Sequence, residues 1–193
     1  SAEMYGGGIA AAEHVMVGVH QSPIKWNQAN NAGGGIAVFD SVDLNLEMSN
    51  VRNNTSYGDG GGIYAHIAQV NGFRSVIADN SAQGAGGGIA ADSAYLNLQF
   101  VTMAKNTARP MGAAFSTNYS AIQIQNSIIW ANDGPAPALS LNDTGAQITY
   151  SDIQGGWDGM GNINVDPVFM DPLNGNYNLT MGSMCIDAGN PDA

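Results

Sequence analysis

The chain has 193 residues, of which 44% are hydrophobic, 11% are charged and 26 are glycine; this excludes a disordered chain and fits one folded, glycine-rich architecture. The net charge of −11 would repel the phosphates of nucleic acids and of anionic membrane surfaces. No apolar run reaches the roughly 18 residues of a membrane helix, so we expect neither a nucleic-acid partner nor a membrane span.

Glycine clusters recur along the chain at a nearly constant interval. They begin at Gly6, Gly33, Gly60, Gly86 and Gly112, which are 27, 27, 26 and 26 residues apart. A fixed period of this length is typical of a repeat protein, in which each unit buries its apolar face against its neighbours.

An asparagine stands six residues ahead of four of these clusters and continues the period one unit further. The series is Asn27, Asn54, Asn80, Asn106 and Asn132. Asparagine tolerates a left-handed backbone, and an inward amide can bond to the amides above and below it. We therefore expect an asparagine ladder, with the glycines where the chain turns or passes close to the next coil. A phosphate-binding role for the glycines would need a strand-to-helix context, which is missing here.

Apolar residues keep the same step and predict inward-facing columns. One column is Ile24, Val51, Ile77, Met103 and Ile129, with Ile153 as a sixth member. A second is Ile9, Ile36, Ile63, Ile89, Phe115 and Leu141. A third is Val17, Leu44, Val70, Leu96, Ile122 and Ile148, and a fourth is Val19, Leu46, Leu98 and Ile124, with Gly72 interrupting it.

The residues between these columns alternate in polarity, as in the stretch from Val42 to Leu46, which is the period of a strand and not of a helix. Equivalent strands stacked at roughly 4.8 Å per coil would form a rod. We therefore predict an all-β fold, a parallel β-helix (solenoid) of about six coils over residues 1–155. Leucine-rich and helical repeats are disfavoured because neither their leucine signature nor a 3.6-residue period is present.

After Ile153 the register fails, and residues 156–193 are expected to form an irregular C-terminal capping segment that covers the last coil. One short strand is expected near Leu179. Cys185, the only cysteine, is expected to be a small buried hydrophobe rather than a nucleophile. At the other end we expect an exposed stacking surface, either because further coils have been cut away or because molecules join end to end.

One polar column offers candidates for chemistry. Fourteen residues before each asparagine stand Glu13, Asp40, His66, Asp92 and Asn118. Stacking of coils would place His66 between the carboxylates of Asp40 and Asp92, as an acid/base cluster or a cation site. The alternative is a row of solvated turn residues, since turns favour Asp and Asn for backbone reasons alone.

The tail offers oxygen ligands for calcium, the one ion that we consider, and no other cofactor is expected. Its candidate ligands are Asp158, Asn162, Asn164, Asp166, Asp171 and Asn174. Their spacing matches no EF-hand or nonapeptide calcium repeat, so hydrated turns are the competing interpretation.

Polysaccharide-cleaving enzymes are the main catalytic alternative. Hydrolases of this kind need paired carboxylates, and lyases need a basic residue beside calcium-binding acids. Of the basic residues Lys25, Arg52, Arg74, Lys105 and Arg109, only Lys25 and Arg52 share an offset in the repeat, and no acid cluster accompanies them. No motif of either enzyme type can be identified. A sugar-binding platform is not evident either, because Trp26, Trp130 and Tyr64 are scattered across offsets.

The Gly-Gly-x-Ile coils of residues 5–155 resemble the right-handed parallel β-helix superfamily, especially bacterial secreted and surface proteins such as polymorphic outer-membrane proteins and autotransporter passengers. The segment from Asn164 to Asp192 resembles the closing segment of large bacterial extracellular β-helix proteins, with Met184 where that family usually has proline. The resemblance implies the right-handed winding and a location outside the cell or on its surface. We expect a structural role as a stalk, adhesin or fibre subunit, with a second copy or a surface glycan as partner; the alternative is a polysaccharide lyase, a glycoside hydrolase or a carbohydrate-binding module.

Overall fold

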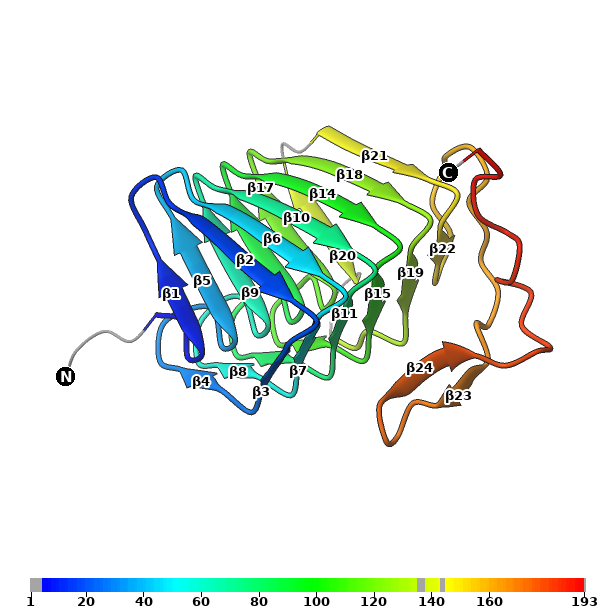
Figure 1. Ribbon diagram of the computed structural model, residues 1–193, viewed down its shortest axis with the longest axis horizontal. Helices are drawn as coiled ribbons and strands as arrows, with labels where there is room; N and C mark the ends of the chain where they lie inside the picture. The colour runs from blue at the N-terminus through cyan, green and yellow to red at the C-terminus, as the bar shows by residue number, and fades with distance from the viewer. Residues whose placement is uncertain (1–4, 135–137, 143–144, 193) are drawn as a thin grey trace.

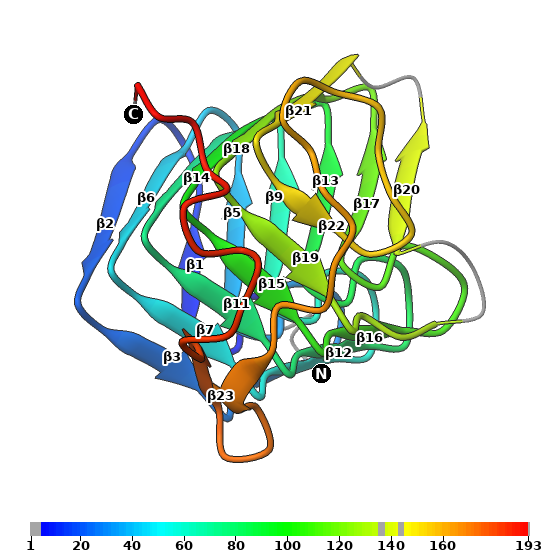
Figure 2. The same cartoon turned by 90° about the vertical axis from the view of Figure 1, so that its right-hand side faces the viewer.

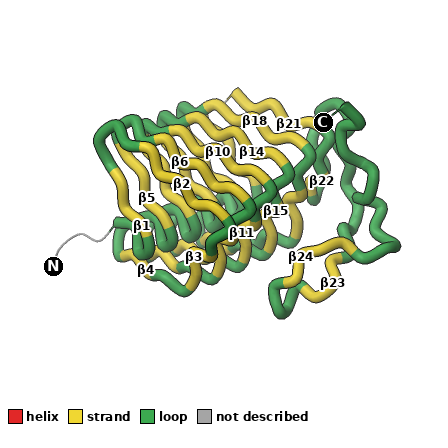
Figure 3. Tube along the Cα trace, viewed as in Figure 1, coloured by secondary structure: helices red, strands yellow, loops and turns green. Residues whose placement is uncertain are grey.

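The computed structural model describes residues 5–134, 138–142 and 145–192, and over these residues it contains strands and turns but no helix. The chain winds into a parallel β-solenoid in which successive turns add strands to the same sheets (Figures 1 and 3). The solenoid makes about five turns, slightly fewer than the six that we expected. No helix in the described ranges has the length and apolarity that a membrane span requires.

Three sheets have six parallel strands each and a fourth has four. The first sheet contains β1 (Ile9–Ala11), β5 (Ile36–Phe39), β9 (Ile63–His66), β13 (Ile89–Asp92), β17 (Phe115–Asn118) and β20 (Leu139–Asn142). The second contains β2 (Met16–His20), β6 (Asp43–Glu47), β10 (Gln69–Phe73), β14 (Tyr95–Gln99), β18 (Ala121–Gln125) and β21 (Gly145–Thr149). The third contains β3 (Pro23–Lys25), β7 (Asn50–Arg52), β11 (Val76–Ala78), β15 (Thr102–Ala104), β19 (Ile128–Trp130) and β22 (Asp152–Ile153). The fourth contains β4 (Gln28–Ala29), β8 (Thr55–Ser56), β12 (Ser81–Ala82) and β16 (Thr107–Ala108).

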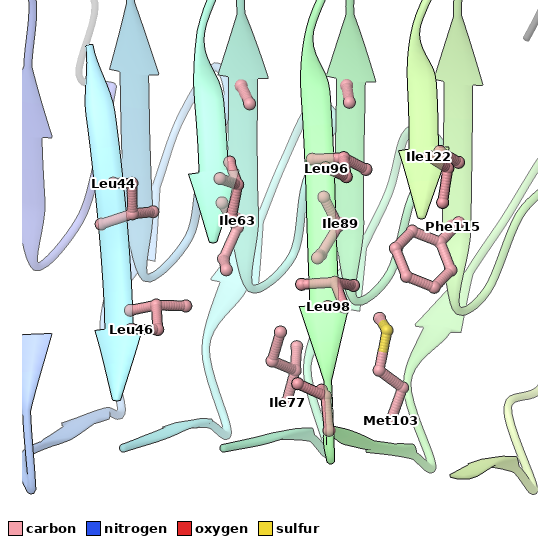
Figure 4. Packing of buried hydrophobic residues seen from close by; sticks show 14 of the residues in the cluster. Leu44, Leu46, Ile63, Ile77, Ile89, Leu96, Leu98, Met103, Phe115 and Ile122 are labelled. Carbon is pink, nitrogen blue, oxygen red and sulfur yellow. The ribbon is translucent and has the colours of Figure 1, made fainter. Parts of the chain in front are cut away.

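The strand register confirms the apolar columns except at two of their last members. Ile36 lies opposite Ile63, which lies opposite Ile89, and all three side chains are fully buried. Figure 4 shows Ile63 and Ile89 between the sheets. The expected sixth member of this column, Leu141, is wrong, because Phe115 lies opposite Leu139 instead. The segment from Asn132 to this strand is two residues shorter than its counterpart from Asn106, so the register slips.

The same shift corrects one member of the third column. Ile122 lies opposite Ala146, and Ile148 lies opposite Ile124. The expected place of Ile148 in the third column is therefore wrong, and this residue continues the fourth column.

Gly72 occupies an inward position between two leucines in neighbouring rungs, where a rung is one turn of the solenoid. A Cβ at Gly72 would come within 2.7 Å of Leu98 Cδ2 and 3.2 Å of Val101 Cγ2. The gap in the fourth column is therefore filled by neighbouring side chains, as close packing of a protein interior requires.

The asparagine ladder is present. In each step the Nδ2 atom of one asparagine donates to the Oδ1 atom of the next, with distances of 3.0 Å from Asn54 to Asn80 and 3.0 Å from Asn80 to Asn106. The same Oδ1 atoms also accept from backbone N–H groups, so these buried amides are satisfied within the protein.

The glycines and the asparagines depend on each other. A Cβ on Gly35 would lie 2.9 Å from Nδ2 of Asn54, and a Cβ on Gly62 would lie 2.9 Å from Nδ2 of Asn80. The third glycine of each of these clusters thus leaves room for the ladder in the next rung. The first glycine has a left-handed backbone, with φ of 68° at Gly33, which other residues adopt only with strain.

A second polar ladder runs through the turn between the second and third sheets. Ser22 N–H donates to Ser49 Oγ and Ser49 N–H to Ser75 Oγ, both at 3.1 Å. The same bond recurs later in the column, where Ser127 N–H donates to Ser151 Oγ at 3.1 Å. Sequence analysis missed these serines, although their spacing follows the repeat, because one position of the column is occupied by Val101.

The first two turns carry one extra residue between the first and second sheets. Asp40 and Ser41 both have left-handed backbones there, with φ of 51° and 67°, whereas Ile67 alone, with φ of 47°, makes the same corner in the next turn. This insertion explains why the period is 27 residues at first and 26 afterwards.

The C-terminal tail does more than cover the last rung. Residues 155–165 stack on its end, where Ile163 N–H donates to Ser151 O at 2.9 Å and Ile153 N–H donates to Ile163 O at 3.0 Å. The chain then forms an antiparallel hairpin of β23 (Phe169–Asp171) and β24 (Asn176–Leu179). Figure 2 looks onto this end of the solenoid, across which the orange and red tail runs.

Candidate functional site

The structure brings together His66 and Asp92 but not Asp40. His66 lies opposite Asp92 in β13 on one side and opposite Phe39 in β5 on the other. Asp40 is displaced by the extra residue in its turn, and it contacts His66 through its backbone N–H, which donates to His66 O at 3.1 Å. The expected placement of His66 between two carboxylates is therefore wrong.

The remaining pair is half-exposed. His66 Nδ1 lies 3.3 Å from Asp92 Oδ2, a distance that fits an ion pair when the imidazole is protonated but without the alignment of a hydrogen bond. Asp92 Oδ1 lies 3.2 Å from Ser93 Oγ and 3.4 Å from Nδ2 of Asn118, both of which donate to it. The pair offers one imidazole and one carboxylate, which fall short of the two carboxyl groups of most glycosidases.

The calcium candidates are dispersed among local turns. Asn162 Oδ1 accepts from Ser151 N–H at 3.0 Å and Asn164 Oδ1 from Gly155 N–H at 3.1 Å. Asp166 accepts from Val168 N–H at 2.9 Å, and Asp171 accepts from Asn174 Nδ2 at 2.8 Å. Asp158 lines a hollow formed by residues 155–158 and 162–164. No group of three or more His, Cys, Asp or Glu side chains is arranged for a metal within the described ranges, and calcium binding stays a prediction.

Asp152 and Cys185 meet beneath the tail, in a cavity of about 230 Å³. Asp152 is 3% exposed and accepts from Val165 N–H at 3.0 Å and from Cys185 Sγ at 3.3 Å. Burial raises the pKa of the Asp152 carboxyl group, and it raises the pKa of the Cys185 thiol to about 11. At neutral pH the thiol is a hydrogen-bond donor and not the thiolate that a nucleophile requires.

A charged cluster holds the hairpin against the outer face of the third sheet. Asp79 Oδ2 accepts from Nη2 of Arg52 at 2.7 Å and from Tyr177 Oη at 2.9 Å, and Nζ of Lys105 lies 3.5 Å from Asp79 Oδ1. Arg52 also donates to Gly175 O at 2.9 Å and lies 5.3 Å from the centre of the Tyr177 ring. Desolvation and the hydrogen bond to Asp79 raise the pKa of the Tyr177 hydroxyl.

This cluster, which we call the hairpin clamp (Arg52, Asp79, Lys105 and Tyr177), was not found by sequence analysis. The offsets of Arg52 and Lys105 within the repeat appeared unrelated, whereas in the folded chain both side chains reach the turn residue Asp79. The feature of the sequence that could have indicated it is a small residue at the outward positions of Ala78 and Ala104. In the structure both alanines are buried because Tyr177 and Phe169 pack over them.

The aromatic residues considered for sugar binding do not lie together, but Tyr64 belongs to a row of rings on the first turns, in which the centres of Tyr5 and Phe39 are 5.1 Å apart. Trp26 is 78% exposed and stands alone in a turn. Tyr64 instead packs with Phe39, whose ring centre is 5.6 Å away, and burial is the main cause that raises the pKa of its hydroxyl.

Comparisons with protein-family models, with curated proteins and with solved structures gave no match to this chain. The parallel β-solenoid is therefore established by its stacked sheets, and the candidate sites by their geometry.

Proposed function

We propose that this chain is a structural rod of an extracellular or cell-surface protein, serving as a stalk, adhesin or fibre subunit. The observation that carries the proposal is the continuous ladder from Asn27 to Asn132, in which every step joins one rung to the next through side-chain and backbone hydrogen bonds. The three middle members, Asn54, Asn80 and Asn106, are buried, and their amide donors and acceptors are all engaged. Such a network fixes one register along the axis.

Stiffness follows from the same geometry. Three six-stranded parallel sheets share one core in the described part of the chain, and each rung contacts only its neighbours. Every rung therefore contributes in the same way to the stiffness of the solenoid. The resemblance of the Gly-Gly-x-Ile coils to bacterial secreted and surface proteins supports a location outside the cell or on its surface.

The test separates this role from polysaccharide cleavage. The protein is incubated with neutral and acidic polysaccharides, with and without calcium, and new reducing or unsaturated ends are measured. A structural rod releases none. Release that disappears in His66→Ala but persists in His14→Ala, a matched exposed histidine, would overturn the proposal in favour of an enzyme.

A second copy of this chain is the partner that we propose for the first rung. Strands β1, β2, β3 and β4 are each paired on one side only in the described part of the chain, and unpaired strand edges are templates for further pairing. Because residues 155–165 cover the other end, we propose that two copies join through this first rung as a closed pair, which favours the stalk and adhesin roles over that of a fibre subunit.

Sedimentation velocity over a range of concentrations tests this pairing. We expect dimers that Val17→Glu abolishes, since Val17 stacks on Leu44 at the open rung. Leu173→Glu, at an 85% exposed site on the hairpin, is the matched control and should leave dimers intact. A wild-type protein that stays monomeric at every concentration contradicts pairing.

A further inference from the structure

The outward face of the second sheet changes character along the rod. Its first two strands carry the ionisable side chains of His20, Asp43 and Glu47. The last three strands, β14, β18 and β21, present a different set in which amides predominate and no carboxylate or basic group occurs. The outward residues of these strands are Tyr95, Asn97, Gln99, Ala121, Gln123, Gln125, Gly145, Gln147 and Thr149.

We call this surface the amide face, defined by the outward residues of β14, β18 and β21. Its strands lie side by side at the upper edge of Figure 1. Register places Asn97 opposite Gln123 and Gln123 opposite Gln147, so that amides form a column along the rod axis. Gln99 and Gln125 start a parallel column that ends at Thr149.

Most of these amides are not engaged within the protein. The side-chain amides of Asn97, Gln99, Gln125 and Gln147 make no hydrogen bond in the described part of the chain, whereas the side chains of the earlier pair Asn71 and Asn45 are bonded at 2.9 Å. Each free amide has two N–H donors and a carbonyl oxygen that can accept two hydrogen bonds. The face therefore offers donors and acceptors in equal supply to a bound molecule.

The amide face is also hollowed. A groove of about 180 Å³ lies between the two columns and spans all three rungs, with Asn97, Gln125 and Gln147 among its walls. A broader hollow of about 560 Å³ adjoins it, lined by Tyr95 and by Tyr119, which is 65% exposed. Tyr95 Oη donates to Gln123 Oε1 at 2.8 Å and links the two hollows.

We propose that the amide face binds a neutral, hydroxyl-rich polysaccharide whose chain lies along the rod axis. Sugar hydroxyls both donate and accept hydrogen bonds, which matches side-chain amides. The exposed Tyr119 and the half-buried Tyr95 offer aromatic surface to the apolar faces of sugar rings. An uncharged surface on a protein of net charge −11 gives an acidic polysaccharide no compensating cation. This inference goes beyond the structural role, since a rod does not require a ligand.

The experiment is affinity electrophoresis of the full chain in gels that contain a β-glucan, a galactomannan, an arabinoxylan or a dextran, with polygalacturonate as the acidic comparison. We expect retardation by at least one neutral polysaccharide and none by polygalacturonate. The double variant Gln123→Ala/Gln125→Ala should weaken that retardation by about tenfold. Gln83→Ala, an exposed glutamine outside the amide face, is the control and should behave as wild type.

Chemical-shift mapping with the retarding polysaccharide gives a readout that needs no variant. Shifts should concentrate on residues 95–99, 121–125 and 145–149. The proposal is overturned by no retardation in any neutral gel, by retardation that the double variant keeps, by preference for polygalacturonate, or by shifts elsewhere. Binding without new chain ends supports both proposals, whereas cleavage overturns the structural role alone.

Discussion

Asn80 shows how a single residue connects three rungs. Its Oδ1 atom accepts from the backbone N–H and the Nδ2 of Asn54, and its Nδ2 atom donates to Val51 O and to Asn106 Oδ1. Asn80 is 1% exposed, so water cannot replace these hydrogen bonds if the side chain is removed. A buried donor left without a partner costs about 1–3 kcal/mol.

Replacing this residue tests the ladder at the residue scale. Asn80→Ala leaves several buried groups unpaired, and we expect a loss of about 3 kcal/mol in the free energy of unfolding. Denaturation in urea measures it. Asn71→Ala, which removes a half-exposed outward amide bonded to Asn45, is the matched control and should cost less than about 1 kcal/mol. Equal losses in the two variants would contradict a special role for the ladder.

Asp152 gives a second prediction at the residue scale, through pH. Because burial raises its pKa in the folded protein, the folded state binds a proton more readily than the unfolded state. The resulting stability is present below the ordinary pKa of aspartate, about 3.9, and is lost as the pH rises through the raised value. Asp152→Asn stays neutral, so we expect its stability relative to wild type to increase with pH across this interval.

Thermal denaturation at a series of pH values between about 3 and 7 measures the difference between the two proteins. Asp158→Asn, an exposed aspartate in the adjoining loop, serves as the control. A difference between Asp152→Asn and wild type that does not change with pH would show that burial of this carboxyl group is not linked to folding.

At the scale of elements, the hairpin of β23 and β24 is attached differently from every other strand pair. The solenoid strands are joined by parallel ladders, whereas the hairpin rests on the outer face through the hairpin clamp and a small apolar contact of Tyr177 with Ala78 and Ala104. Elements with few buried contacts open locally before the whole protein unfolds. The hairpin is therefore expected to exchange its amide hydrogens faster than the core strands.

Loss of one clamp contact should affect the hairpin alone. Tyr177→Phe keeps the ring but removes the hydroxyl that donates to Asp79 at 2.9 Å. A hydrogen bond to a charged group contributes about 1.5–3 kcal/mol, so exchange within residues 169–179 should accelerate at least about tenfold. Hydrogen exchange followed by mass spectrometry measures it, with Asn178→Ala on the same strand as control. Unchanged exchange in the hairpin would contradict the clamp.

Elements also differ in how far they could be predicted. The columns through Ile36, Ile63 and Ile89 were predictable because the repeat itself encodes which residues stack. The neighbour of His66 in the preceding rung, Phe39, was not, because one inserted residue at Asp40 and Ser41 shifts the register locally. The contact between Asp79 and Tyr177 joins residues 98 positions apart and occurs once, so no period reveals it.

At the scale of the whole molecule, the central claim is that successive turns of the backbone lie directly on one another. His20 and Thr149 stand at matching positions on β2 and β21, at the two ends of the same column of the second sheet. Five strand-to-strand steps separate them, and at about 4.8 Å per step the expected Cα–Cα separation is about 24 Å.

Double electron–electron resonance between spin labels at His20→Cys and Thr149→Cys, in a Cys185→Ser background, measures this separation. If the turns are stacked, we expect one narrow distribution centred near 24 Å, allowing for the length of the labels. A broad distribution, or one centred far beyond that distance, would contradict the stacking of turns on which the fold and both proposals rest.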